Sequence, residues 1–169
     1  MIPADEHLVL VGLMGVGKST VARIIGGRLG RPVLDTDHMI EARTGRSVRQ
    51  IFTEDGEAAF RDLESAVLAE ALASPAPVVV AAAGGVVLRD ENRTLLRAAK
   101  ARVVWLCADP ATLADRVRSA GHRPLLDDDP EGTLQRMAET RAPLYREVAD
   151  AIVLVDHRAL ADVVEAVLR

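Results

Sequence analysis

The stretch Gly12-Leu13-Met14-Gly15-Val16-Gly17-Lys18-Ser19 decides the fold of this chain. It fits the pattern G-x-x-x-x-G-K-[ST], and it lies between an apolar run at residues 8–11 and a segment whose apolar residues have helical spacing. In this context the glycines let successive backbone N–H groups turn toward a phosphate group, and the helix adds its positive dipole end. The stretch therefore predicts a phosphate-binding loop. The alternative is a glycine-rich turn that binds no ligand.

Two side chains of the loop have chemical roles that fit a nucleoside triphosphate. The ammonium group of Lys18 would bridge the β- and γ-phosphates, and the Ser19 hydroxyl would ligate Mg²⁺. Among the 21 basic residues only Lys18 and Lys100 are lysine, so this chain otherwise uses arginine. A lysine at this position supports the phosphate loop, because a compact point charge is wanted there.

Outward from the loop, strands and helices alternate along the chain. Short apolar runs predict five strands, at residues 7–11, 32–35, 78–82, 102–107 and 151–155, each apolar enough to be buried on both faces. Three- and four-residue spacing of apolar residues predicts helices at 18–29, 54–73, 92–99, 110–119, 131–148 and 158–168. This order predicts an α/β fold with a five-stranded parallel sheet flanked by helices, in a single domain over residues 1–169. Ligands then bind at the carboxyl ends of the strands.

Composition excludes several classes of protein. Of the 169 residues, 49% are hydrophobic and 27% are charged, which suits one globular domain and not a disordered chain. A net charge of −4 and 2% aromatic residues argue against a nucleic-acid partner, which needs a basic face or aromatic stacking platforms. The one cysteine, Cys107, excludes an intrachain disulfide and fits a reducing compartment.

The sequence gives no sign of a membrane partner or a secretory signal. The most apolar stretch, residues 75–88, is too short to span a bilayer and is interrupted by prolines and glycines. Residues 1–7 lack the basic and apolar regions of a signal peptide. We therefore expect a cytoplasmic protein, and we expect it to be a monomer.

Two carboxylates follow the second predicted strand, in Asp35-Thr36-Asp37. Alternation along an extended chain places both on the same side, at the sheet edge where the phosphates would lie. Asp35 could hold a Mg²⁺-bound water, and Asp37 could accept a hydrogen bond from an acceptor hydroxyl and orient it for in-line attack. In the alternative interpretation, Asp37 caps a helix that begins at His38 and Asp35 is a solvated turn residue.

Arg61 lies between Glu57 and Glu64 at helical spacing. A surface ladder of ion pairs would explain this spacing without any ligand. In the functional interpretation, the planar Arg61 guanidinium binds a substrate carboxylate while Glu64 holds it in place. Phe52 and Phe60, the only phenylalanines, flank this arginine. They are core residues, an apolar wall beside a substrate ring, or both together.

Three later segments complete the candidate site. Gly84 and Gly85, after the third predicted strand, allow the backbone to approach a ligand closely, unless they only form a turn. The loop that begins at Gly121 has the length of a lid, and its Arg123 could reach the transferring phosphoryl group; the alternative is a disordered acidic loop. A proline two residues after Arg141 predicts a kink that re-aims this arginine.

The ordered set of motifs resembles the shikimate kinases. The motifs that carry the resemblance are the phosphate loop, Asp35-Thr36-Asp37, Phe60-Arg61-x-x-Glu64, Gly84-Gly85, Arg123-Pro124-Leu125-Leu126 and Arg141-x-Pro143-Leu144-Tyr145, and no Asn-Lys-x-Asp motif for reading guanine accompanies them. The resemblance covers about residues 8–158. It implies a P-loop NTPase fold of the nucleoside-monophosphate-kinase-like type. It also implies transfer of the γ-phosphate of ATP to the 3-hydroxyl of shikimate, in the chorismate route to aromatic amino acids, with Mg²⁺ as cofactor.

The resemblance implies a role for each motif residue. Shikimate would contact Asp37, Arg61, Gly84 and Arg141. The ATP phosphates would contact Gly15, Val16, Gly17, Lys18, Ser19 and Thr20. Ser19 would hold Mg²⁺, with Asp35 as the second residue of the metal site, while Arg116 would pack on adenine and Arg158 would touch the nucleotide. The catalytic residues would be Lys18, Asp37 and Arg123, with a substrate-binding segment at about residues 36–64 and a lid at about 119–130.

One departure from the family and two alternative functions stay open. The family usually has three glycines where this chain has Ala83-Gly84-Gly85, which bears on the shape of the acceptor pocket. A kinase of another small hydroxy acid, such as gluconate, would share the phosphate loop, the fold and a carboxylate-binding arginine. A non-catalytic nucleotide-binding domain would be expected to lack Lys18, Ser19, Asp37 or Arg123, and all four are present.

Overall fold

The computed structural model describes residues 1–120 and 128–169 and contains a single parallel sheet. Its strands are β1 (His7–Val11), β2 (Val33–Asp35), β3 (Val79–Ala81), β4 (Ala101–Cys107) and β5 (Ala151–Leu154). They lie in the order β2-β3-β1-β4-β5, and every neighbouring pair is parallel, with Leu8 opposite Val79 on one side and Arg102 on the other. The predicted five-stranded parallel sheet is therefore confirmed.

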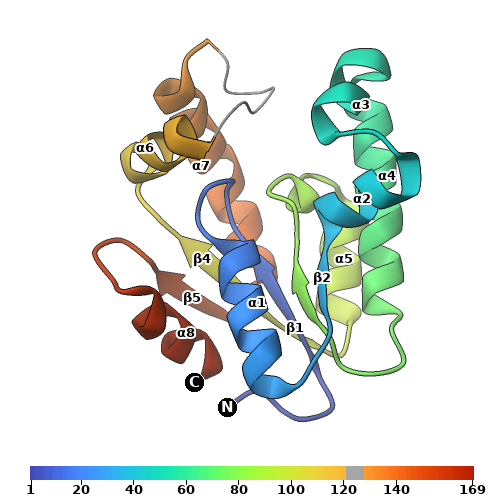
Figure 1. Ribbon diagram of the computed structural model, residues 1–169, viewed down its shortest axis with the longest axis vertical. Helices are drawn as coiled ribbons and strands as arrows, with labels where there is room; N and C mark the ends of the chain where they lie inside the picture. The colour runs from blue at the N-terminus through green and yellow to red at the C-terminus, as the bar shows by residue number, and fades with distance from the viewer. Residues whose placement is uncertain (121–127) are drawn as a thin grey trace.

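Helices cover both faces of this sheet (Figure 1). They are α1 (Lys18–Leu29), α2 (Thr36–Thr44), α3 (Val48–Glu54), α4 (Gly56–Leu72), α5 (Asp90–Ala98), α6 (Pro110–Ala120), α7 (Pro130–Val148) and α8 (Leu160–Leu168), with a short 3-10 helix at Val86–Leu88. Helices α1 and α8 pack together on one face, and α5 and α7 pack together on the other. No helix of the described residues is long and apolar enough to cross a membrane.

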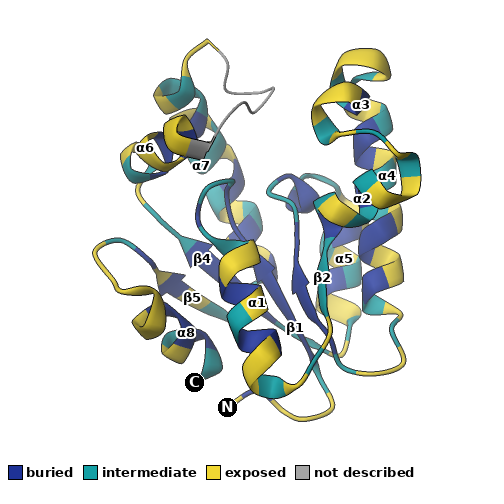
Figure 2. Ribbon diagram, viewed as in Figure 1, coloured by how far each residue is buried: buried dark blue, intermediate teal, exposed yellow. Residues whose placement is uncertain are grey.

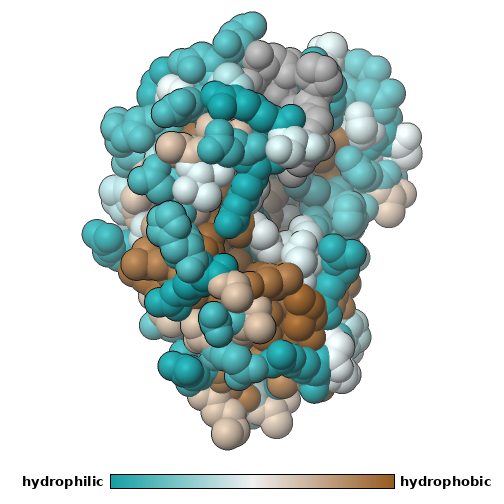
Figure 3. Space-filling model, turned by 60° about the vertical axis from the view of Figure 1, so that its left-hand side comes forward, coloured by the Kyte–Doolittle hydropathy of each residue, from teal (hydrophilic) through white to brown (hydrophobic). Residues whose placement is uncertain are grey.

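The three central strands form the middle of the core, as Figure 2 shows. Every residue of β1 and β3 is buried, which fits strands that are covered by helices on both faces. The prediction that every strand is buried on both faces is wrong for the edge strand β5, where Ile152 and Leu154 are 46% and 56% exposed. These two side chains and Leu160 of α8 are exposed large hydrophobic residues, and apolar surface gathers on the side of the molecule seen in Figure 3.

The helix predicted at residues 54–73 is confirmed as α4, but the segment between β2 and β3 also contains α2 and α3, which apolar spacing did not predict. Asp55 separates α3 from α4, and α4 begins at Gly56, whose φ of 86° is left-handed. Helix α3 begins with a capping box, in which the Ser47 side chain accepts from the Gln50 N–H and the Gln50 side chain accepts from the Ser47 N–H. Glycine at the break is required because other residues rarely adopt this φ.

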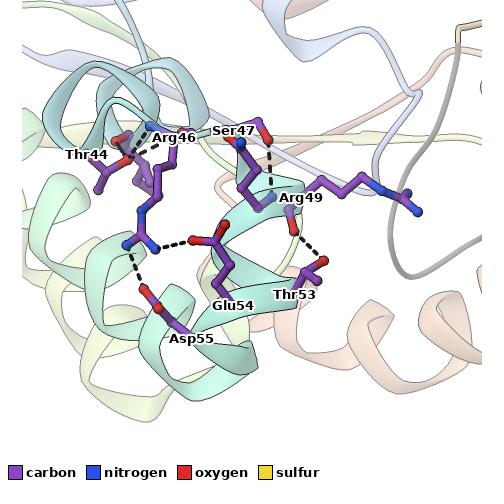
Figure 4. A network of polar contacts seen from close by, with 9 residues as sticks. Thr44, Arg46, Ser47, Arg49, Thr53, Glu54 and Asp55 are labelled. Atoms are coloured by element: carbon purple, nitrogen blue, oxygen red, sulfur yellow. Dashed lines mark hydrogen bonds and ion pairs between the residues drawn. The ribbon is translucent and has the colours of Figure 1, made fainter.

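Helices α2, α3 and α4 form an arm with its own small core and its own polar network. Ile40, Ile51, Phe60 and Val67 make up that core, apart from the main cluster. Arg46, in the turn before α3, donates to Glu54 at 3.0 Å and to Asp55 at 2.6 Å. These contacts are drawn as dashed lines in Figure 4. The Arg46 guanidinium lowers the pKa of Asp55. These exposed ion pairs add little stability, and their geometry closes the turn onto the end of α3.

Helix α7 passes through Pro143 without ending, from Pro130 to Val148. Asp129 caps it, and its side chain accepts from the N–H of Gly132 at 3.1 Å. Because proline lacks an N–H, a kink was expected at this position. The helix continues on both sides of Pro143. Arg141, two residues before this proline, is buried.

Candidate active site

The phosphate loop connects β1 to α1 at the carboxyl edge of the sheet. Two of its glycines are required by the backbone: Gly12 has a φ of 143°, and a Cβ there would lie 2.4 Å from the carbonyl oxygen of Leu106. Gly17 has a φ of 105° and is the N-cap residue of α1. The Lys18 ammonium donates to the carbonyl oxygens of Gly12 at 2.7 Å and Leu13 at 3.0 Å. The loop therefore has the left-handed turns that a phosphate cradle needs, with its lysine folded back across it.

Asp35 joins this loop to the second strand. Its Oδ2 accepts a 2.5 Å hydrogen bond from the Ser19 hydroxyl, and its Oδ1 accepts from the N–H groups of Asp37 and His38 at 3.1 and 3.4 Å. Asp35 is thus the N-cap of α2, whereas the alternative interpretation gave the cap to Asp37 and left Asp35 in solvent. A hydroxyl and a carboxylate in contact beside a phosphate loop fit the protein ligands that Mg²⁺ uses together with nucleotide phosphates.

A cavity of about 290 Å³ lies against the loop and brings most of the candidate residues together. It is lined by Met14, Gly15, Gly17, Lys18, Ser19, Thr20, Asp35, Asp37, Val48, Phe52, Phe60, Arg61, Glu64, Ala81, Ala82, Ala83, Gly84, Gly85 and Arg141. In Figure 1 the arm rises on one side of the phosphate loop, and α6 and α7 rise on the other. The cavity therefore joins the phosphate loop to two arginines that lie far apart in the sequence.

Arg61 is buried in this cavity wall and is not a residue of a surface ladder. Its side chain is 8% exposed, and its Nη1 donates to both carboxylate oxygens of Glu64 at 3.0 Å while Nη2 donates to Glu57 at 3.1 Å. The Glu57-Arg61-Glu64 pairs thus exist, but they hold the arginine inside the protein. Phe52 and Phe60 line the cavity, and their ring centroids lie 4.7 Å apart. They therefore pack as core residues and also form part of the cavity wall.

Glu64 is the most buried charged side chain of this group, at 1% exposure. Burial raises the pKa of its carboxyl to about 7, because the ionised form loses its hydration. The Arg61 and Arg141 guanidinium groups act in the opposite direction, while the Asp37 carboxylate raises this pKa further. Glu64 is therefore a carboxyl whose charge depends on pH near neutrality.

Arg141 enters the cavity from the opposite side, on α7. It is buried, and its Nη1 lies 3.6 Å from the place where a Cβ of Gly84 would be. The Tyr145 hydroxyl, one helical turn later, donates to the Gly84 carbonyl at 2.5 Å, and the Arg141 guanidinium acts to lower the pKa of this phenol. Burial raises the pKa of this phenol. Arg141, Tyr145 and the turn after β3 thus form one connected unit.

Sequence reasoning missed two residues that support this unit. The Thr36 hydroxyl is fully buried and accepts from the Ala83 N–H at 2.9 Å, which ties the start of α2 to the turn after β3. Tyr145 belongs to one of the sequence motifs, but the motif assigns it no contact. The four-residue spacing from Arg141 was the available signal, since it places both side chains on one face of a helix. Thr36 also belongs to a sequence motif, Asp35-Thr36-Asp37, but that motif gives its hydroxyl no partner.

Several residues of the predicted nucleotide site lie outside the cavity. Val16 is buried in the core, and its carbonyl oxygen accepts from Arg116 Nη1 at 3.4 Å. The side chains of Arg116 and of Arg158, which lies between β5 and α8, are exposed. Arg123 and most of the predicted lid fall at residues 121–127, outside the described residues. Their roles stay predictions.

Fold and site together define a class of protein. A doubly covered parallel sheet presents a glycine-rich loop, its lysine and its serine at the carboxyl edge. The adjoining cavity is lined by the Asp37 carboxylate, which can accept a hydrogen bond from a hydroxyl, and by two buried arginines, which can bind an anionic group. Such a site belongs to a P-loop phosphotransferase that acts on a small acid.

Comparison with known proteins identifies the family. The model of the shikimate kinase family matches residues 14–169. A shikimate kinase of Symbiobacterium thermophilum is 47% identical over 165 residues, with 96% of this chain and 94% of that protein covered. One of Burkholderia pseudomallei is 45% identical, with 97% and 90% covered. The structure of shikimate kinase from Acinetobacter baumannii in complex with shikimate has a TM-score of 0.92 and 36% identity, covering 97% of this chain and 91% of that chain. The chain belongs to the shikimate kinase family.

Proposed function

We propose that this protein transfers the γ-phosphate of ATP to the 3-hydroxyl of shikimate, in the chorismate route to aromatic amino acids. The observation that carries the proposal is that Arg61, Arg141 and Asp37 share one cavity with the phosphate-loop residues Lys18 and Ser19. A small hydroxy acid in this cavity places its carboxylate on the arginines and a hydroxyl near Asp37. The transferring phosphoryl group then lies at the end of the cavity that the phosphate loop forms.

Charged side chains at both ends of the acceptor molecule orient it. Arg61 and Arg141 bind the carboxylate, the turn at Gly84 allows close approach of the backbone, and Asp37 accepts a hydrogen bond from the attacking hydroxyl. The hydroxyl oxygen forms a bond to the γ-phosphorus while the bond to the bridging oxygen of ADP breaks, so that ADP leaves. Asp37 thus orients the nucleophile, and the hydroxyl proton is released as the phosphate ester forms.

The donor is held by the phosphate loop. The backbone of residues 15–20 binds the phosphates, and the Lys18 ammonium exchanges the carbonyl oxygens of Gly12 and Leu13 for phosphate oxygens. Ser19 and Asp35 would hold Mg²⁺, which neutralises phosphate charge when bound. Arg116 packs on adenine, Arg158 contacts the nucleotide, and Arg123 stabilises the transferring group.

The protein acts on ATP and shikimate as a cytoplasmic monomer, with no nucleic-acid or membrane partner. A net charge of −4 supports the absence of a nucleic-acid partner, since binding to a phosphate backbone favours a basic protein.

An ADP-release assay with shikimate and with gluconate as acceptors tests the proposed function. We expect acceptor-dependent ADP release with shikimate and release at the level of the acceptor-free control with gluconate. The reverse preference would make the protein a kinase of another small acid. ADP release that neither acid stimulates, with nucleotide binding intact, would make it a non-catalytic nucleotide-binding domain.

A further inference from the structure

Gly85 has a backbone conformation that does not call for glycine. Its φ is −86° and its ψ is 0°, values that residues with a side chain adopt freely. It differs in this from Gly12 and Gly17 of the phosphate loop, whose φ angles are 143° and 105°. The reason for a glycine at position 85 must therefore lie in the space around it.

That space is filled by the guanidinium group of Arg61. A Cβ at Gly85 would lie 1.9 Å from Arg61 Nη1, 2.4 Å from Cζ and 2.6 Å from Nη2, all well inside contact distance. The guanidinium thus rests on the backbone of the turn after β3. A Cβ at Gly84 would have its nearest neighbouring atoms 3.3 to 3.6 Å away, so the surroundings of Gly84 are much less restrictive.

The guanidinium cannot easily move away from an added methyl group. Nη1 is bound by both carboxylate oxygens of Glu64 at 3.0 Å, and Nη2 is bound by Glu57 at 3.1 Å. The Phe60 and Phe52 rings lie 5.3 and 6.0 Å from Cζ. Since the group is buried, any displacement breaks charge-assisted hydrogen bonds that water does not replace.

We propose that Gly85 is a positioning residue for the acceptor, because the missing side chain at this position sets the place and plane of the Arg61 guanidinium. The guanidinium group of Arg61 then lies at a fixed distance from the phosphate loop. The site therefore favours acids whose carboxylate and hydroxyl groups are separated by a matching distance. Gly85 acts through Arg61 and not through the backbone. The statement about the acid rests on the proposed function, whereas the coupling between Gly85 and Arg61 does not.

A double-mutant cycle of Gly85→Ala and Arg61→Ala tests this coupling, with Tm and shikimate binding by calorimetry measured for all four proteins. We expect Gly85→Ala alone to lower Tm and to weaken shikimate binding by about tenfold or more, while the KM for ATP stays within about twofold. In the Arg61→Ala background the same substitution has room for its methyl group. There it should leave Tm unchanged or raise it, because alanine at an ordinary φ loses less entropy on folding than glycine.

Every result of the cycle decides the proposal. If Gly85→Ala does not fold but the double variant does, the coupling is supported. If Gly85→Ala lowers Tm equally in both backgrounds, or if both variants fail to fold, the methyl group clashes with something other than Arg61 and the proposal is overturned. Unchanged Tm and shikimate affinity in Gly85→Ala would overturn it too. If the unmodified protein does not phosphorylate shikimate, the proposed function fails, and the Tm values still report on Gly85 and Arg61.

Discussion

The hydroxyl group of Tyr145 donates a 2.5 Å hydrogen bond to the carbonyl oxygen of Gly84, which lies 61 positions earlier in the chain. It joins the last turn of α7 to the turn after β3, close to the two places from which Arg141 and the glycine backbone reach the cavity. The phenol is buried, so this bond is shielded from water. Tyr145, which does not line the cavity, thus fixes the relative position of two groups that do.

Tyr145→Phe should weaken both the fold and the acceptor site. The ring keeps its packing on Trp105 at 5.5 Å, while the Gly84 carbonyl loses its partner, so we expect a loss of about 1 to 2 kcal/mol in the free energy of unfolding. The KM for shikimate should rise by about three- to tenfold with the KM for ATP unchanged. Denaturant titration and steady-state kinetics give the two values. Equal KM values in both proteins would limit Tyr145 to packing.

Lys18→Met should abolish useful turnover and leave the fold intact. The substitution removes the ammonium group that meets the negative charge developing on the transferring phosphoryl group. Loss of one such preorganised contact costs about 10²- to 10³-fold in kcat. Turnover within about tenfold of the unmodified protein, with an unchanged Tm, would contradict the role given to Lys18.

Arg61→Lys should affect the acceptor and spare the donor. Lysine keeps the charge, but it cannot hold Glu64 and Glu57 and also present a planar fork to a carboxylate. We expect the KM for shikimate to rise by about tenfold or more, which corresponds to about 1.4 kcal/mol, while the KM for ATP stays nearly constant. If neither KM moves, Arg61 only supports the buried ion pairs.

Glu64 should make stability fall as pH rises toward neutrality. Burial raises its folded pKa to about 7 from the ordinary value of 4.5, so between these values the folded protein binds more protons at this site than the unfolded chain does. The free energy of unfolding then decreases with rising pH, by about 1.4 kcal/mol per pH unit at most. Glu64→Gln lacks this contribution, so we expect its stability relative to the unmodified protein to rise from about pH 4.5 to pH 7. A difference that does not vary with pH would show that Glu64 stays ionised.

Ala83→Gly tests the departure from the three glycines that are usual in the family. Ala83 lies two residues beyond the end of β3, and His157 is the only non-glycine residue of the described chain with a positive φ. Alanine is therefore unstrained, and glycine should cost about 0.5 to 1 kcal/mol of stability through the entropy of the unfolded chain.

We expect kcat/KM for shikimate to change by less than about threefold in Ala83→Gly. The Ala83 N–H keeps its bond to Thr36, and the turn keeps its shape. A gain of about tenfold would mean that the Ala83 methyl group intrudes on the acceptor, and a differently shaped acid would then be the better substrate.

The parts of the site that depend on neighbouring residues in the sequence could be predicted, and those that depend on packing could not. The residues of the phosphate loop and the carboxylate at Asp35 follow from motifs of a few residues next to a strand. The burial of Arg61 does not, because the spacing of Glu57 and Glu64 is the same in a surface ladder. Which side of α4 meets the cavity is decided by the small core of the arm.

The secondary structure, too, could be predicted where local sequence decides it and could not where packing decides it. The central strands are apolar at every position, so their place in the sheet could be predicted. The edge strand β5 has an equally apolar sequence, but its exposed residues Ile152 and Leu154 share one face of the strand, which the described helices leave largely uncovered. Apolar spacing predicted α4, but it did not predict the short helices α2 and α3, although Gly56 and the Ser47 capping box are local signals of where α3 begins and ends.

The Lys18 ammonium already makes two hydrogen bonds to carbonyl oxygens of its own loop. In the proposed function, nucleotide binding is an exchange of ligands at a cation that has already lost part of its water. That part of the desolvation cost falls on folding and not on binding, so the contribution of Lys18 to the affinity for a polyphosphate depends on how much better phosphate oxygens are than carbonyl oxygens as acceptors. Because the carbonyl groups are neutral dipoles, we expect a terminal phosphate with more negative charge to gain more from this exchange than one with less.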